Sequence, residues 1–193
     1  MLRKQKIKSA TKEWVKAILI GLSLFIIIRT FLFAPVLVDG KSMESTLQDE
    51  DRLIVTRLGN LERFDIVVFH ANDKDDYIKR VIGLPGDTIA YVNDQLFING
   101  EQYNEEYIEE DIRSHKDQFG EDALYTGNFT LEDKLGFEEV PEDTIFVMGD
   151  NRPHSWDSRD IGVVPLDSVI GEARVLFWPF KNSTLLTNGH KDE

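Results

Sequence analysis

The sequence predicts a mainly β domain that follows a single N-terminal transmembrane helix. Short runs of β-branched and aromatic residues, bounded by turn residues, recur along most of the chain, and one uncharged apolar run lies near its N-terminus. The chain has 193 residues, enough for one domain with a sizeable core. The strands that we expect are residues 52–57, 65–69, 77–82, 88–92, 95–98, 144–148 and 173–178.

Turn residues between the expected strands support this assignment. Asn99 and Gly100 fit a two-residue type I′ hairpin, in which both central residues need a positive φ. In residues 84–87 (LPGD), Pro85 and Gly86 occupy the positions that a type II turn favours. Short strands at this spacing indicate a mainly β domain.

The N-terminal apolar run is long enough to cross a bilayer. Residues 17–28 carry no charge, and apolar residues resume after Arg29 and Thr30. A span over residues 14–33 has 20 residues, which matches a hydrocarbon core of about 30 Å. A buried core helix and a cleaved secretory signal are the alternatives, but no A-x-A cleavage site follows the run. We therefore expect an uncleaved anchor, with the membrane lipid bilayer as a partner.

The distribution of charge predicts the orientation of this anchor. Residues 1–16 hold six of the 22 basic residues of the chain and one acidic residue, Glu13. Basic residues beside a span stay in the cytoplasm, so residues 1–13 should form a cytoplasmic tip. Residues 34–193 should then form an extracytoplasmic β domain of a single-pass protein in the cell membrane.

One part of this domain lacks the strand pattern. Residues 101–143 show little regular alternation and contain a cluster of acidic residues between positions 105 and 111. We interpret this segment as an acidic insertion or surface subdomain.

Composition excludes several classes of function. The chain has no cysteine, so cysteine zinc sites, iron–sulfur clusters and thiol nucleophiles are excluded, and its four histidines are scattered. With 35 acidic residues against 22 basic ones, the net charge of −13 argues against a nucleic-acid partner. Neither a G-x-S-x-G nor an H-E-x-x-H motif occurs. The sequence thus gives no reason to expect a metal or a cofactor.

Two segments hold residues from which a hydrolytic site could be built. The segment GKSMESTL (residues 40–47) follows the apolar run, and a serine there would need an adjacent base to act as a nucleophile. In the expected strand 77–82, Lys79 and Arg80 point to opposite faces, so one cation lies on a largely apolar face. Burial lowers the pKa of a lysine, whereas an arginine does not deprotonate, so Lys79 is the candidate base. The alternative is a capping box at residues 46–49 and a lysine that reaches solvent at a sheet edge.

A third segment, MGDNRPHSWDSRDIG (residues 148–162), is rich in Gly, Asp, Asn and Ser. Residues of this kind join a loop through side-chain to backbone hydrogen bonds, and Asp157 and Arg159 could form a structural ion pair. His154 stands beside Ser155, but adjacent side chains point apart, so we do not expect a triad there.

These three segments, in this order behind one apolar span, resemble bacterial type I signal peptidases, and the Gram-positive members in particular. The resemblance implies coiled antiparallel β-sheets with a shallow groove, a fold shared with self-cleaving Ser–Lys repressors. It implies a membrane-bound serine endopeptidase that removes N-terminal signal peptides from secretory preproteins through a Ser–Lys dyad. The preproteins would carry small residues at positions −1 and −3 of the cleavage site.

The resemblance also implies roles for individual residues. Ser42 would be the nucleophile, with its backbone N–H as an oxyanion donor, and Lys79 would be the general base. Ser155 matches a serine that orients the lysine. Residues that match supporting positions are Asp150, Asp157 and Arg159.

Two positions depart from the family pattern. Many Gram-negative relatives have a serine that donates to the oxyanion where this chain has Gly40, and Ser45 replaces the usual proline. A soluble self-cleaving repressor is disfavoured by the anchor and the acidic body. A catalytically impaired, membrane-tethered peptide-binding paralogue is disfavoured because Ser42 and Lys79 are both retained.

Overall fold

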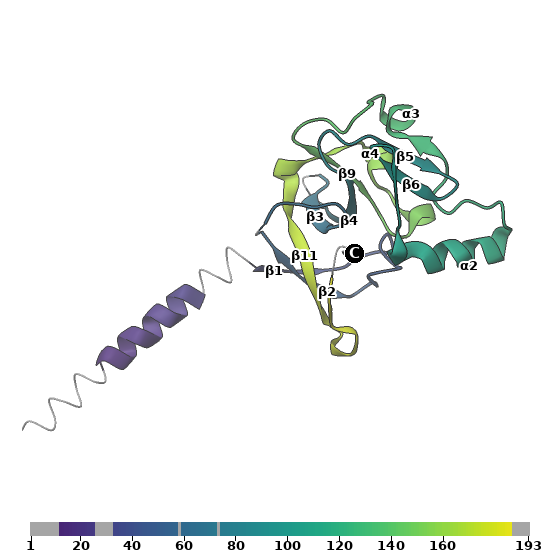
Figure 1. The fold of residues 1–193 in the computed structure, drawn as a ribbon. Helices are drawn as coiled ribbons and strands as arrows, with labels where there is room; N and C mark the ends of the chain where they lie inside the picture. The colour runs from purple at the N-terminus through teal and green to yellow at the C-terminus, as the bar shows by residue number, and fades with distance from the viewer. Residues whose placement is uncertain (1–11, 26–32, 58, 73, 187–193) are drawn as a thin grey trace, which may run out of the picture. The chain divides into compact units, whose positions relative to one another are not determined.

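The computed structural model describes residues 12–25, 33–57, 59–72 and 74–186 (Figure 1). The chain divides into two units, residues 1–34 and 35–193. In the first unit, residues 12–25 form a helix, and the rest of the expected tip and span, residues 1–11 and 26–32, lies outside the described residues. No helix in the described part of the chain combines the length and the hydropathy needed to cross a membrane.

Two β-sheets form the second unit, so the prediction of a mainly β domain is confirmed (Figure 1). In the larger sheet the strands lie in the order β1 (Phe33–Leu37), β2 (Arg52–Thr56), β11 (Val169–Trp178), β3 (Ile66–His70), β4 (Asp76–Gly83), β9 (Thr144–Met148) and β10 (Val164–Pro165), and β12 (Thr184–Leu185) pairs with β11. The smaller sheet has the order β7 (Glu101–Tyr103), β6 (Gln95–Ile98), β5 (Ile89–Val92) and β8 (Phe129–Thr130).

All seven predicted strands are present, and both predicted turns are formed. Asn99 and Gly100 both have positive φ, +55° and +79°, and the hairpin joins β6 to β7. Gly86 has φ +82°, and the Asp87 N–H donates to the Leu84 carbonyl at 3.0 Å, as a type II turn requires.

One strand, β11, is longer than predicted because it begins at Val169 rather than at residue 173. Its first half pairs with β3 and its second half with β2, and its register shifts between Val169 and Gly171 and again between Ala173 and Val175. These bulges break the alternation of apolar residues, which hides the start of the strand in the sequence.

The remaining elements are short helices. They are η1 (Glu106–Ile108), α2 (Glu109–Phe119), α3 (Leu131–Leu135), η2 (Arg152–His154), α4 (Ser158–Ile161), η3 (Leu166–Ser168) and η4 (Phe180–Asn182). The first three belong to the segment 101–143, and α2 itself buries no residue. The segment nevertheless contributes Ile108, Phe129 and Leu131 to the interior of the domain. It also supplies the strands β7 and β8, so it is part of the smaller sheet rather than a subdomain attached to the surface.

A buried arginine ties this segment to the loop after β9. Arg152 is fully buried, and its guanidinium donates to Glu105 at 2.5 Å and to the hydroxyls of Tyr91 at 3.0 Å and Thr126 at 3.1 Å. Its Nε donates to the Gly149 carbonyl at 3.0 Å. Each polar atom of this cluster is thus paired inside the domain, which buried charges require.

We expect Arg152→Ala to lower the free energy of unfolding by about 3–5 kcal/mol, because it leaves Glu105 buried without a counter-charge. Chemical denaturation of the purified protein measures this loss. The control is Arg113→Ala, because the Arg113–Glu109 pair is largely exposed and contributes only about 0–1 kcal/mol. Equal losses in the two variants would contradict the role of the buried pair.

Candidate active site

The segment 40–47 forms a tight loop between β1 and β2 that presents Ser42. Met43 and Leu47 are buried under the loop, and the Leu47 N–H donates to the Met43 carbonyl at 2.7 Å. Ser42 directly precedes Met43, is half-buried and lines a groove. Met43 and Leu47, four positions apart on one helical turn, hold the loop to the core of the larger sheet.

Lys79 of β4 reaches this serine. Its side chain is buried, with an exposed fraction of 4%, and its Nζ lies 2.6 Å from Ser42 Oγ. The ring of Tyr77, on the same face of β4, lies 5.2 Å from Nζ. The structure thus brings together the two residues that the resemblance pairs, although 37 positions separate them in the chain.

Burial lowers the pKa of Lys79 to about 8, because the charged ammonium loses its hydration. The charges of Asp157 and Asp150 oppose this shift, and that of Arg159 adds to it. A large share of Lys79 is therefore neutral at slightly alkaline pH.

The neighbouring cation, Arg80, is also buried and pairs with Asp150. Nε and NH2 of Arg80 donate to the two carboxylate oxygens at 2.9 Å and 2.6 Å. The Thr46 hydroxyl donates to the same carboxylate at 2.5 Å, so Asp150 links β4 to the serine loop. The capping-box interpretation of residues 46–49 is therefore wrong, because Thr46 bonds to Asp150 and Asp49 accepts from Gly40 at 2.9 Å.

The loop after β9 holds the serine loop from the other side. The Asn151 backbone N–H donates to the Ser42 carbonyl, and its side-chain amide donates to the Lys41 carbonyl, both at 3.0 Å. A Cβ on Gly149 would lie closer than 3.0 Å to the Ser42 carbonyl oxygen and to Ser155 Oγ. Sequence reasoning missed both Gly149 and Asn151 as positioning residues, although both stand in the GDNR motif.

Asp157 and Arg159 form the ion pair that the sequence suggested. The buried Asp157 accepts from Arg159 Nε and NH2, each at 2.9 Å, and from the Gly149 N–H at 3.0 Å. Burial alone would raise the pKa of Asp157, but its hydrogen bonds and ion pair with Arg159 hold that pKa below its usual value. Asp157 also caps α4 by accepting from the Arg159 N–H.

Ser155 and Gly40 lie near Ser42 and Lys79, but neither makes a hydrogen bond to these two side chains. Ser155 Oγ is buried and has no hydrogen-bond partner among the described residues, so its orienting role stays a prediction. Gly40 has φ +99°, and its N–H is engaged by Asp49. Gly40 therefore supplies no free donor to the groove.

Ser42 and Lys79 line a groove of about 530 Å³ that β1 and β4 flank. Val36, Val38 and Ile78 give it apolar walls, and Trp156, 61% exposed, stands at its rim. Across the described ranges, no group of three or more histidine and carboxylate side chains could hold a metal ion. The arrangement suits acyl transfer by a serine whose base is a lysine.

Comparisons with known proteins agree with this chemistry. Residues 11–178 match the family described as signal peptidase, peptidase S26. Signal peptidase I of Bacillus caldolyticus is 45% identical over 185 residues, which cover 93% of this chain and 97% of that protein. Signal peptidase IB of Staphylococcus aureus strain N315 is 35% identical over 181 residues, covering 90% of this chain and 92% of that protein.

A solved structure extends the match to the fold. The crystal structure of a signal peptidase I from Enterococcus faecalis V583 is 41% identical, with a TM-score of 0.54, and covers 60% of this chain and 97% of that one. None of these relatives supports the catalytically impaired alternative. The chain belongs to the signal peptidase, peptidase S26 family, serine endopeptidases that remove signal peptides from secretory preproteins.

Proposed function

We propose that Ser42 and Lys79 are the catalytic dyad of this peptidase. The observation that carries the proposal is the 2.6 Å separation of Lys79 Nζ and Ser42 Oγ, together with the burial of the lysine. Neutral Lys79 accepts the Ser42 proton while Oγ attacks the carbonyl carbon of the scissile bond. The resulting ammonium gives the proton to the leaving amine, and an ester of Ser42 with the signal peptide remains. Water, deprotonated by Lys79, then hydrolyses the ester and restores Ser42.

The Ser42 backbone N–H is our proposed oxyanion donor. It makes no hydrogen bond within the described part of the chain, whereas the Gly40 N–H is taken by Asp49. A donor fixed in advance where negative charge develops stabilises the transition state without reorganisation. Asn151 and Thr46 hold the loop that carries this N–H, so we regard them as positioning residues.

Four further residues are proposed to position the dyad rather than to react. Asp150 fixes the serine loop through Thr46, and the Asp157–Arg159 pair fixes the loop after β9 through Gly149. Ser155, buried against Gly149, orients the lysine.

The substrate would lie as an extended strand in the groove between β1 and β4. Small residues at −1 and −3 suit shallow apolar subsites such as those formed by Val36, Val38 and Ile78. In an extended chain every second side chain points to the same face, so the residues at −1 and −3 would both face the groove.

The family is membrane-associated, and we propose that residues 14–33 anchor this chain with residues 1–13 in the cytoplasm. Support comes from the apolar side chains of the helix 12–25, among them Trp14, Ile18 and Leu19, which are 57–72% exposed. Residues 34–193 would then lie outside the cell membrane, where signal peptides emerge.

The dyad is tested with detergent-solubilised full-length protein and a signal-peptide substrate. Ser42→Ala and Lys79→Ala should each lower kcat/KM by roughly 10³-fold or more, because residues that act as a unit are each indispensable. Lys134→Ala, an exposed lysine on α3, is the control and should retain activity. Cleavage that survives Ser42→Ala would refute the assignment.

The pH dependence of cleavage follows from the pKa of Lys79, about 8. Only neutral Lys79 can accept the serine proton, so kcat/KM should rise about 50-fold between pH 6 and pH 8 and level off above about pH 9. Initial rates at low substrate concentration measure this profile. A flat profile over that range would exclude Lys79 as the base.

Gly149→Ala tests the contact between the two loops. Its new methyl group would overlap the Ser42 carbonyl oxygen, so Ser42 must shift. We expect kcat/KM to fall by about 100-fold, since a displacement near 1 Å has such an effect. The free energy of unfolding, measured in parallel, should fall by only about 1–3 kcal/mol, so the protein stays folded. Unchanged activity would show that the loops tolerate the shift.

A further inference from the structure

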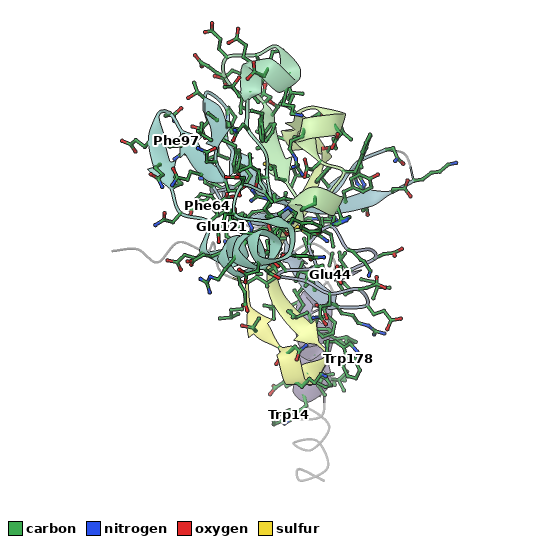
Figure 2. The ribbon with its side chains drawn as sticks, turned by 90° about the vertical axis from the view of Figure 1, so that its right-hand side faces the viewer. Trp14, Glu44, Phe64, Phe97, Glu121 and Trp178 are labelled. Carbon is green, nitrogen blue, oxygen red and sulfur yellow. The ribbon has the colours of Figure 1, made fainter. Side chains whose placement is uncertain are left out.

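A second groove, of about 400 Å³, lies beside the serine loop at Glu44 and Ser45, whereas the first lies at residues 40–43. Its walls come from three segments: Glu44 and Ser45 of the serine loop, helix α2 of the segment 101–143, and Asn151 and His154 after β9. Figure 2, in which α2 is seen end on, shows Glu44 to one side of the helix. His154 lines both grooves, so the two grooves adjoin at this side chain.

The two grooves differ in the chemistry of their walls. The first has Val36, Val38 and Ile78 beside the dyad and suits the signal-peptide side of the scissile bond. A substrate chain that fills this groove up to Ser42 continues beyond the nucleophile, and the groove that adjoins the first at His154 is a candidate site for that continuation.

The walls of the second groove combine aromatic rings with carboxylates. The ring of His115 on α2 lies 4.7 Å from that of Phe119 and 5.6 Å from that of Tyr125, and Phe119 is 62% exposed. Asp111, one turn before His115, and Glu44 of the serine loop, whose carboxylate also lies 3.9 Å from the exposed Lys41 Nζ, supply two negative charges. No lysine or arginine is among the described residues that line this groove. Long basic side chains match such walls, because their stems pack on rings while their charge reaches the carboxylates.

We propose that this groove binds the first residues of the mature chain, after the scissile bond, and favours lysine or arginine among them. The inference rests on the proposed function, because it assumes that the bond is cleaved at Ser42. It also assigns a role to the segment 101–143, whose helix α2 forms one wall of the subsite. Tyr125 of this segment also lines the groove, and its hydroxyl donates to the Asp150 carbonyl at 3.1 Å, so this wall is joined to the catalytic region.

The test uses detergent-solubilised full-length protein and peptides that share one signal-peptide end. Their mature ends differ only by a single Lys, Gln or Glu placed at +2, +3, +4 or +5. Each carboxylate contributes as an exposed ion pair, so at the best position kcat/KM for Lys should exceed that for Glu by roughly three- to ten-fold. The preference should weaken at 0.5 M salt, because the Debye length, over which charges act on one another, shortens to about a few ångströms.

Variants then assign the preference to the groove. Glu44→Gln combined with Asp111→Asn should abolish it, and Asp111→Lys should reverse it in favour of Glu. The matched control is Asp117→Asn, which makes the same chemical change on the same helix at an exposed residue outside the groove. It should leave the preference intact.

The outcomes separate this inference from the dyad assignment. If wild-type protein cleaves all the peptides at equal rates, or if the double variant keeps the preference, the subsite is refuted and the dyad stands. A second peptide set carries the same three residues before the scissile bond and keeps one mature end. A preference confined to that set would show that the signal peptide occupies this groove, which also refutes the inference. Cleavage by Ser42→Ala would instead refute the dyad.

Discussion

Lys79 can be buried in a partly neutral form because Arg80, the next residue, forms the ion pair with Asp150 that Lys79 would otherwise make. Both carboxylate oxygens of Asp150 accept from the Arg80 guanidinium, and one also accepts from Thr46. The Asp157 carboxylate is held in the same way by Arg159 and Gly149. An unpaired carboxylate within reach would pair with Lys79 and raise its pKa. Less of the lysine would then be neutral at any pH below that pKa. The two arginines therefore keep the acids beside the dyad from disabling its base.

The same contacts fix the geometry of the nucleophile. Asp150 stands between β4 and the serine loop, so one carboxylate orients the strand that carries Lys79 and the loop that carries Ser42. Buried pairs of this kind add little net stability, because desolvation opposes the attraction. Their contribution here is to select one arrangement of three chain segments that lie far apart in sequence.

The strands and the tight turns could be predicted from the sequence because their signals are local. Alternating apolar residues located β4, and the inability of arginine to deprotonate singled out Lys79 there. The extent of β11 could not be predicted, because its bulges form only when β2 and β3 pair with its two halves. The sequence motifs included Gly149 and Asn151, but the reasons for them depend on the approach of Ser42, more than 100 positions away. Likewise, nothing local in the acidic run 105–111 indicated that Glu105 alone turns inward to meet Arg152.

The ion pair between Glu105 and Arg152 limits how the segment 101–143 can be exchanged between relatives. Glu105 belongs to the interior of the domain, whereas α2, only four positions later, buries no side chain. A chimera that replaces Glu105 by a neutral residue would leave Arg152 without its carboxylate, whereas one that exchanges only residues 109–119 would keep both this pair and the buried Phe129 and Leu131. The part that can be exchanged without disturbing the interior is therefore α2, which is shorter than the acidic segment 101–143 that the composition indicates. A graft that begins after Glu105, inside the acidic run, would therefore exchange the α2 wall of the second groove and leave the buried ion pair intact.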